Sequence, residues 1–226
     1  MMGIRISDLS FAHGGRPVLA GLRLAMRAGE RLAVLGPSGS GKTTLLRLIA
    51  GLERPAMGRI ELGGVTVSTP SVVTPPHARG VSMAFQFPAL WPHMTVLANA
   101  TFGVAGVGKA EARERAEALL AEVGLAGFGG RYPHQLSGGE AKRVALVRAL
   151  ASQRAILLLD EPLVHVEPAL RDALLGVIRA QVATTGATLL YVTHDAAEAA
   201  SVVERCAWLV DGQLVDDAPG ALPRPG

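Results

Sequence analysis

The chain has little of several residue types, and each shortage excludes a class of protein. Its single cysteine, Cys206, excludes an internal disulfide framework. No uninterrupted apolar run approaches the ~18 residues of a membrane-spanning helix, although 49% of the 226 residues are hydrophobic. The first residues lack an apolar signal core, so we expect a cytoplasmic protein that is not exported.

Aromatic residues and runs of like charge are also scarce. Only 4% of the residues are aromatic, which leaves few platforms for stacking single-stranded bases. The formal net charge is +3, and the 22 basic residues are scattered among 19 acidic ones. Composition and length therefore predict one globular domain with two lobes that does not bind nucleic acid.

The most informative segment present is glycine-rich and fits the pattern G-x-x-x-x-G-K-[ST]. A strand candidate (residues 31–35) precedes it and a helix candidate (residues 44–50) follows it. This order predicts a phosphate-binding loop, with Lys42 on the β- and γ-phosphates and Thr43 on Mg²⁺. The predicted nucleotide-binding residues of this loop are Gly36, Pro37, Ser38, Gly39, Ser40, Gly41, Lys42, Thr43 and Thr44.

The remaining pattern is that of an α/β protein. Residues 68–80 contain three prolines and are expected to form an exposed connection. Strands are expected over residues 4–11, 22–26, 81–85, 155–159 and 188–192, hairpins over 59–67 and 208–215, and helices over 109–123, 139–151 and 168–182.

Polar side chains follow two of the expected buried strands. Asp160 and Glu161 come after one strand, and His194 comes after another. Ligands bind beyond the carboxyl ends of parallel strands, so we expect these groups to converge with the phosphate loop. Asp160 would hold Mg²⁺, Glu161 would poise water for attack on the γ-phosphate, and His194 would contact that phosphate or water. Without the loop, the acidic pair would more often be a solvated turn, and His194 would as often be a surface histidine as a functional one.

A second motif, Leu-Ser-Gly-Gly-Glu, stands ahead of a helix candidate. With it, the sequence resembles the ATP-binding cassette (ABC) ATPases over essentially the whole chain. The resemblance matches residues 36–43 to Walker A, Gln86 to the Q-loop, residues 136–140 to the signature, residues 156–161 to Walker B and His194 to the switch histidine.

The signature would form a second phosphate site, because it offers a hydroxyl and backbone amides at a helix start. By resemblance, it closes over ATP bound to another copy, which implies a homodimer with ATP at the interface. Gln86 would ligate Mg²⁺ or its water and link the two lobes. The predicted residues of this second site are Ser137, Gly138, Gly139 and Glu140.

The resemblance also implies a fold, partners and a location. The fold would be a P-loop NTPase with a RecA-like core, an antiparallel β lobe and a helical ABC-specific lobe. A single domain over residues 1–226 would have a core lobe at about 1–86 and 152–226 and a helical lobe at about 87–151. The helical lobe would contact a transmembrane permease, and a solute-binding protein would act through that permease. The chain would then be peripheral, on the cytoplasmic face of the plasma membrane.

The sequence departs from the family pattern at three places, one of which is Phe87, where the family commonly has a polar residue after the Q-loop glutamine. His13 stands where the family usually has an aromatic residue that stacks on adenine; we favour His13 for this role, with Phe11 as the alternative. Residues 164–167 read Val-His-Val-Glu where the family typically has Ser-Ala-Leu-Asp. We expect this last departure to weaken communication between the two ATP sites without removing the chemistry.

The leading interpretation is the ATPase subunit of a bacterial importer, because residues 87–99 resemble the corresponding stretch of importer ATPases. The chain stops at Gly226 without an added regulatory domain, so shorter relatives serving thiamine, molybdate or sulfonates are expected to be nearer. One alternative is a nucleotide-binding switch with weak hydrolysis. Another is a soluble ABC protein acting on ribosomes or DNA, which the absence of a second cassette or a long coiled coil disfavours.

Overall fold

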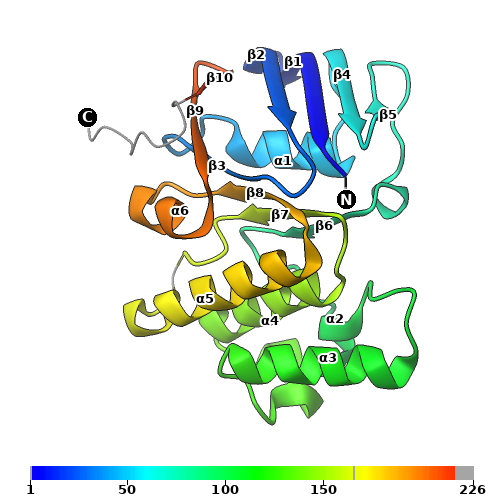
Figure 1. The fold of residues 1–226 in the computed structure, drawn as a ribbon, viewed down its shortest axis with the longest axis vertical. Coiled ribbons are helices and arrows are strands. Elements are labelled where there is room, and N and C mark those ends of the chain that lie inside the picture. The colour runs from blue at the N-terminus through cyan, green and yellow to red at the C-terminus, as the bar shows by residue number, and fades with distance from the viewer. Residues whose placement is uncertain (1, 165, 217–226) are drawn as a thin grey trace. The chain divides into compact units, whose positions relative to one another are not determined.

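The computed structural model describes residues 2–164 and 166–216, drawn as a coloured ribbon in Figure 1. These residues form two compact units, and each is described by itself. The first unit contains residues 2–81, 155–160 and 186–216, and the second contains residues 82–154 and 161–185, His165 apart. Within the described ranges, no helix is both long and apolar enough to cross a bilayer.

One antiparallel sheet of the first unit has the strand order β2-β1-β4-β5. Its strands are β1 (Ile4–His13), β2 (Arg16–Met26), β4 (Met57–Leu62) and β5 (Val65–Ser68). Buried and exposed residues alternate along the start of β1, as expected of a strand with one face on a core. Both β1 and β2 are longer than predicted, because the alternation weakens toward the turn at Gly14 and Gly15 while strand pairing continues.

The other sheet of the first unit holds the more deeply buried strands. Its order is β10-β9-β3-β8-β7; β9, β3, β8 and β7 run parallel, and β10 is antiparallel to β9. Every residue of β7 and β8 is buried, which explains their continuous apolar runs. The strands are β3 (Arg31–Leu35), β7 (Ile156–Asp160), β8 (Thr188–Val192), β9 (Arg205–Val210) and β10 (Gln213–Asp216).

Helices α1 (Lys42–Ala50) and α6 (Ala196–Val202) also belong to the first unit. Helix α1 follows β3 after the glycine-rich loop and ends at Gly51, whose φ of 83° suits a left-handed cap. Helix α6 follows β8 and is capped by Asp195, whose carboxylate accepts hydrogen bonds from two backbone amides. Strand β6 (Val81–Ala84) begins at the last residue of this part of the unit and continues into the second unit.

The sequence predicts an exposed connection over residues 68–80, but part of this connection is buried. It contains the short 3-10 helix η1 (Pro76–Ala78), and its Arg79 side chain is buried. Arg79 donates to the carbonyl oxygens of Leu48 and Ile49 at the end of α1, at 3.1 and 2.9 Å. It also donates to Thr74 O at 2.7 Å, Val67 O at 3.0 Å and Ser68 Oγ at 2.7 Å.

These acceptors explain how a guanidinium is tolerated in the interior. Burial lowers the pKa of Arg79 to about 10, and the carbonyl dipoles offset part of the desolvation cost. The guanidinium also fills the space beside Gly51, where an added Cβ would overlap it. The prediction failed here because proline content indicates a loop but says nothing of where a following arginine points.

The second unit is helical. Helix α4 (Gly138–Ala151) packs against both α2 (Val96–Thr101) and α3 (Lys109–Glu122), and most of the second half of α4 is buried. Helix α5 (Pro168–Thr185) completes the unit. Two short 3-10 helices, η2 (Phe128–Gly130) and η3 (Pro133–Gln135), lie between α3 and α4. Figure 1 shows α3 and α4 side by side.

The predicted elements match the observed ones closely, but two short helices, α2 and α6, were not predicted. The observed units share most residues with the predicted lobes; the clearest difference is α5, which clusters with the second unit. That the chain folds as one domain stays a prediction.

Candidate functional site

The glycine-rich loop joins the end of β3 to the start of α1. Gly36 and Gly41 have φ of 150° and 105°, and a Cβ at either position would collide with neighbouring atoms. At Gly36 it would lie 2.8 Å from the Leu209 carbonyl oxygen, and at Gly41 it would lie 2.9 Å from Val18 Cγ1. Glycine is therefore required at both ends of the loop by conformation and by space.

Lys42 and Thr43 open α1 and point to different partners. Lys42 is buried, and its Nζ donates to the carbonyl oxygens of Gly36 and Pro37, at 2.7 and 2.9 Å. Its ammonium is thus folded back over the loop that precedes it. Thr43 Oγ1 donates to Asp160 Oδ1 at 3.1 Å, which ties the loop to the last residue of β7.

The loop also holds a polar atom without a protein partner. Ser40 Oγ is buried, and among the described residues it has no hydrogen-bond partner. A hydroxyl in this state is costly unless a ligand satisfies it, and a phosphate oxygen is a suitable acceptor. Together with Lys42 and the helix start, this hydroxyl fits a phosphate group. Of the remaining loop residues, Pro37, Ser38 and Gly39 are exposed and Thr44 is half-buried.

Parallel pairing brings three of the predicted groups to one edge of the sheet. Val34, two residues before Gly36, and Asp160 are both in register with Val192 of the central strand β8. His194 is the second residue after Val192 and is exposed. The phosphate loop, Asp160 and His194 thus share the carboxyl edge of β3, β7 and β8, where ligands of open α/β sheets bind.

In the second unit, Gln86 and Glu161 lie together. Gln86 Nε2 donates a long hydrogen bond of 3.5 Å to Glu161 Oε2, so the amide faces the carboxylate. Glu161 has a φ of 45°, a left-handed conformation that is uncommon for residues other than glycine and clusters at functional sites. The arrangement presents a carboxylate on a sharply turned backbone.

The signature residues form the capped start of α4. Ser137 Oγ accepts from the Glu140 amide at 3.3 Å, and the Glu140 carboxylate accepts from the Ser137 amide at 2.6 Å. These two bonds are a capping box. Hydrogen bonding to Ser137 lowers the pKa of Glu140, and the bond from the Ser137 backbone has the larger effect. Gly138 and Gly139 occupy the first two positions of the helix, where their amides have no intrahelical acceptor.

A cavity of about 460 Å³ adjoins the exposed part of the phosphate loop. His13, predicted to stack on adenine, is exposed at the end of β1 and does not line this cavity. Phe11 is half-buried on the same strand. The lining residues of the cavity are Pro17, Val18, Ala20, Pro37, Ser38, Gly39, Ser40, Leu209, Val210, Asp211 and Gly212.

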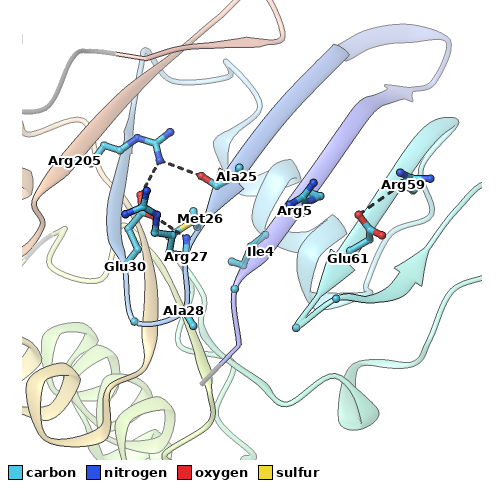
Figure 2. Close-up of a pocket in the computed structure, with 14 residues that line it drawn as sticks. Ile4, Arg5, Ala25, Met26, Arg27, Ala28, Glu30, Arg59, Glu61 and Arg205 are labelled. Atoms are coloured by element: carbon cyan, nitrogen blue, oxygen red, sulfur yellow. Dashed lines mark hydrogen bonds and ion pairs between the residues drawn. The ribbon is translucent and has the colours of Figure 1, made fainter.

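A cavity of about 1200 Å³ lies elsewhere in the first unit and includes none of the predicted site residues. Figure 2 shows its charged lining, in which Arg205 donates to Ala25 O at 3.1 Å and to Glu30 Oε1 at 2.7 Å. Arg59 and Glu61 form a looser pair, with 3.8 Å between Nε and Oε2. The two bonds of Arg205 tie β9 to β2 and to the turn that follows β2.

A strand, a glycine-rich loop and a helix in this order, with a buried lysine and a threonine joined to a strand-end aspartate, define a P-loop nucleotide-binding protein. Residues 19–164 match the ABC transporter family, and the chain belongs to that family. The resemblance noted in the sequence is thereby confirmed.

The curated relatives are importer subunits. The chain is 46% identical over 223 residues to an Fe(3+) ions import ATP-binding protein of Rhizobium etli, covering 98% of this chain and 61% of that protein. It is 44% identical over 232 residues to a sulfate/thiosulfate import ATP-binding protein of Caulobacter vibrioides, covering 96% and 67%. Both relatives are longer than this chain, contrary to the expectation that shorter relatives would be nearer.

Solved structures support the same fold. A dimeric ATP-binding cassette in a post-hydrolysis state, bound to ADP and Pi, aligns with a TM-score of 0.85 at 27% identity over 96% of this chain and 98% of that one. A dimeric bacterial ABC transporter cassette aligns with a TM-score of 0.83 at 29% identity over 93% and 96%. The predicted fold class, a P-loop NTPase with a helical ABC-specific lobe, is confirmed.

One contact near the site was not anticipated from the sequence. Lys142 Nζ donates to the carbonyl oxygen of Val164 at 2.7 Å, which joins α4 to the segment after Glu161. A lysine in the first turns of a helix carries no sequence signal for this, because most such lysines are solvated.

Proposed function

We propose that the chain is the ATP-binding and hydrolysing subunit of an ABC importer. The observation that carries the proposal is the hydrogen bond from Thr43 Oγ1 to Asp160 Oδ1. It joins the phosphate loop to the acidic end of a buried strand, the pairing that P-loop NTPases use around a nucleotide and its metal. Family membership and the importer names of the relatives support the same conclusion.

Three predicted site residues of the first unit have proposed roles in nucleotide binding. Lys42 exchanges its bonds to Gly36 and Pro37 for phosphate oxygens, since an ammonium pairs more favourably with a phosphate than with carbonyl dipoles. Ser40 donates its hydroxyl to a phosphate oxygen, and His194 contacts the γ-phosphate or the attacking water.

Thr43, Asp160 and Gln86 are the proposed protein ligands of Mg²⁺, directly or through water. Hydroxyl, carboxylate and amide oxygens suit this hard cation, which when bound neutralises charge on the phosphates. In the described part of the chain no cluster of three or more His, Cys, Asp or Glu residues could hold a metal. Phosphate oxygens and water would supply the other ligands of a bound Mg²⁺.

Glu161 acts as the general base in this proposal. Its carboxylate accepts a proton from the water that attacks the γ-phosphate, and the Gln86 amide faces that carboxylate.

The signature residues bind the γ-phosphate of ATP held by a second copy. Ser137 retains a hydroxyl proton to donate while its oxygen accepts from the Glu140 amide. The amides of Gly138 and Gly139 add to this anion site at the start of α4. The protein would work as a homodimer with ATP at the interface. This proposal is supported by its two structural neighbours, which are both dimeric.

The remaining partners follow from the importer assignment. We propose that a transmembrane permease docks on the second unit, that a solute-binding protein acts through the permease, and that the chain is peripheral on the cytoplasmic face of the membrane. The two relatives import iron ions and sulfate or thiosulfate, so the proposed cargo is a small inorganic or organic ion.

The decisive experiment measures Mg²⁺-dependent ATP hydrolysis against protein concentration for the native chain and for Glu161→Gln. Activity that rises more than linearly and falls ~10²- to 10⁴-fold in the variant supports a dimeric ATPase with a glutamate base. A native chain that binds ATP but turns over as slowly as the variant, even with its permease, would identify a nucleotide-binding switch instead. Co-purification with a multi-spanning permease separates the importer from a soluble ABC protein.

A further inference from the structure

The bond between Lys142 and Val164 connects two parts of the site within the second unit. Lys142 lies near the start of α4, which is capped by the signature residue Ser137. Its Nζ donates to the Val164 carbonyl oxygen at 2.7 Å, a short distance for an ammonium donor. Val164 follows Glu161 by three residues and opens the segment in which the sequence departs from the family.

The backbone from Glu161 to Val164 is a tight turn. The Val164 amide donates to the Glu161 carbonyl oxygen at 3.4 Å, and Leu163 between them is buried. The left-handed φ of Glu161 is unfavourable, and such conformations persist only where surrounding contacts hold them. The Lys142 bond is one of these contacts, because it fixes the carbonyl at the end of the turn.

The setting of the ammonium strengthens its bond to the carbonyl. Burial lowers the pKa of Lys142, and the negative charge of Glu161 acts in the opposite direction. A half-buried donor loses less to competing water than an exposed one, so its hydrogen bond is stronger. The negative charge of Glu161 thus lies close enough to favour the charged form of Lys142.

We propose that Lys142 is a positioning residue for Glu161. Its bond to the Val164 carbonyl oxygen fixes the turn that contains Glu161. The bond joins this turn to the first turns of α4, next to the signature residues. The signature site and the general base are thereby kept in one geometry by a single side chain. This inference rests on the proposed function of Glu161 as the base in ATP hydrolysis.

Three variants test this role. Lys142→Met keeps the length and bulk of the side chain but removes the hydrogen-bond donor and the charge. Lys142→Arg keeps the donor and the charge. Lys109→Met is the matched control, because Lys109 is the chain's other lysine outside the phosphate loop and is exposed at the start of α3. Circular dichroism and thermal unfolding establish that each variant is folded.

The kinetic readout is the separate effect on kcat and on the KM for ATP. We expect Lys142→Met to lower kcat on the order of tenfold through misplacement of the base. The KM for ATP should stay within twofold, because the phosphate loop belongs to the other unit. Lys142→Arg should recover most of the kcat, and Lys109→Met should match the native chain. A kcat of Lys142→Met equal to the native value would overturn the proposal.

Hydrogen exchange provides a readout that does not depend on activity. Amides in a peptide covering residues 161–167 should exchange faster in Lys142→Met than in the native chain, and not in Lys109→Met. Equal exchange would overturn the positioning role whatever the turnover. Faster exchange in a protein whose native form does not hydrolyse ATP would keep the tie between α4 and the turn but refute the proposed function of Glu161.

Discussion

Thr43 and Asp160, 117 residues apart in the sequence, are joined by a hydrogen bond of 3.1 Å from the hydroxyl to the buried carboxylate. The first prediction concerns this pair. Asp160→Asn keeps the shape of the side chain but removes the negative charge that would attract Mg²⁺. We expect this variant to raise the Mg²⁺ concentration needed for half-maximal ATP hydrolysis roughly 10- to 100-fold.

Thr43→Val is the companion variant, because it removes the hydroxyl at nearly constant volume. It should weaken the response to Mg²⁺ in the same direction. ATP binding measured in EDTA should change little in either variant, since Lys42 and the loop remain. Native Mg²⁺ dependence in Asp160→Asn would show that this carboxylate does not serve the metal.

The second prediction uses the capping box of α4. The lowered pKa of Glu140 means that its ionised form stabilises the folded state. This contribution is complete above the ordinary value of 4.5 and is lost as the pH falls through the lower value of the folded protein. At pH 7, Glu140→Gln should therefore have a lower Tm than the native chain, and the difference should shrink as the pH is lowered from 5 to 3.

Glu114→Gln is the control for this pH series. Glu114 is exposed on α3, and we expect its Tm to follow that of the native chain at every pH. A Glu140→Gln difference that persists unchanged at pH 3 would assign the effect to packing and not to charge.

The third prediction concerns the buried guanidinium of Arg79. Arg79→Met removes the donor to four carbonyl oxygens and leaves them without that partner. We expect a loss of about 3 kcal/mol in the free energy of unfolding, measured by urea denaturation at pH 8. Arg113→Met, which breaks an exposed pair with Glu117, should cost about 0.5 kcal/mol or less. Equal losses would contradict the structural role of Arg79.

The fourth prediction concerns residues 164–167, of which His165 lies outside the described residues. Replacing Val-His-Val-Glu by Ser-Ala-Leu-Asp should raise the cooperativity of ATP hydrolysis, because a small polar residue and a shorter acid would restore the usual dimer contacts. The Hill coefficient for ATP is the measurement. Unchanged turnover and cooperativity would show that residues 164–167 do not affect the coupling between the two ATP sites.

The fifth prediction compares His13 with Phe11 as the adenine platform. Loss of a stacking ring should cost about 1 kcal/mol, or roughly fivefold in the Kd for ATP. We expect this effect in His13→Ala and not in Phe11→Ala. The reverse result would assign adenine stacking to Phe11.

The sequence predicts the elements whose local pattern matches their burial. Strand β3 and strand β8 have the expected bounds, because continuous apolar runs between turn residues leave one interpretation. Helices α2 and α6 were missed because six or seven residues hold too few turns for a periodic pattern. Their starts are fixed instead by the Thr95 and Asp195 side chains, which accept hydrogen bonds from backbone amides.

The candidate site likewise contains parts that the sequence predicts and parts that it does not. The phosphate loop, Asp160 and His194 could be placed at one sheet edge because motif order and parallel pairing determine their positions. The bond between Lys142 and Val164 could not, because it depends on how a helix and a turn 22 residues apart pack together. Arg79 was missed for a related reason: its acceptors are backbone oxygens, which every residue type carries.

The buried position of the Arg79 guanidinium also restricts which substitutions the chain tolerates in evolution. An added methyl group at Gly51 would overlap the guanidinium, and the left-handed φ of 83° disfavours any other residue there even when the space is free. A smaller residue at position 79 in turn leaves the oxygens at the end of α1 unpaired. A deep mutational scan should therefore find substitutions harmful at both positions, and a smaller residue at position 79 should not rescue a substitution at Gly51.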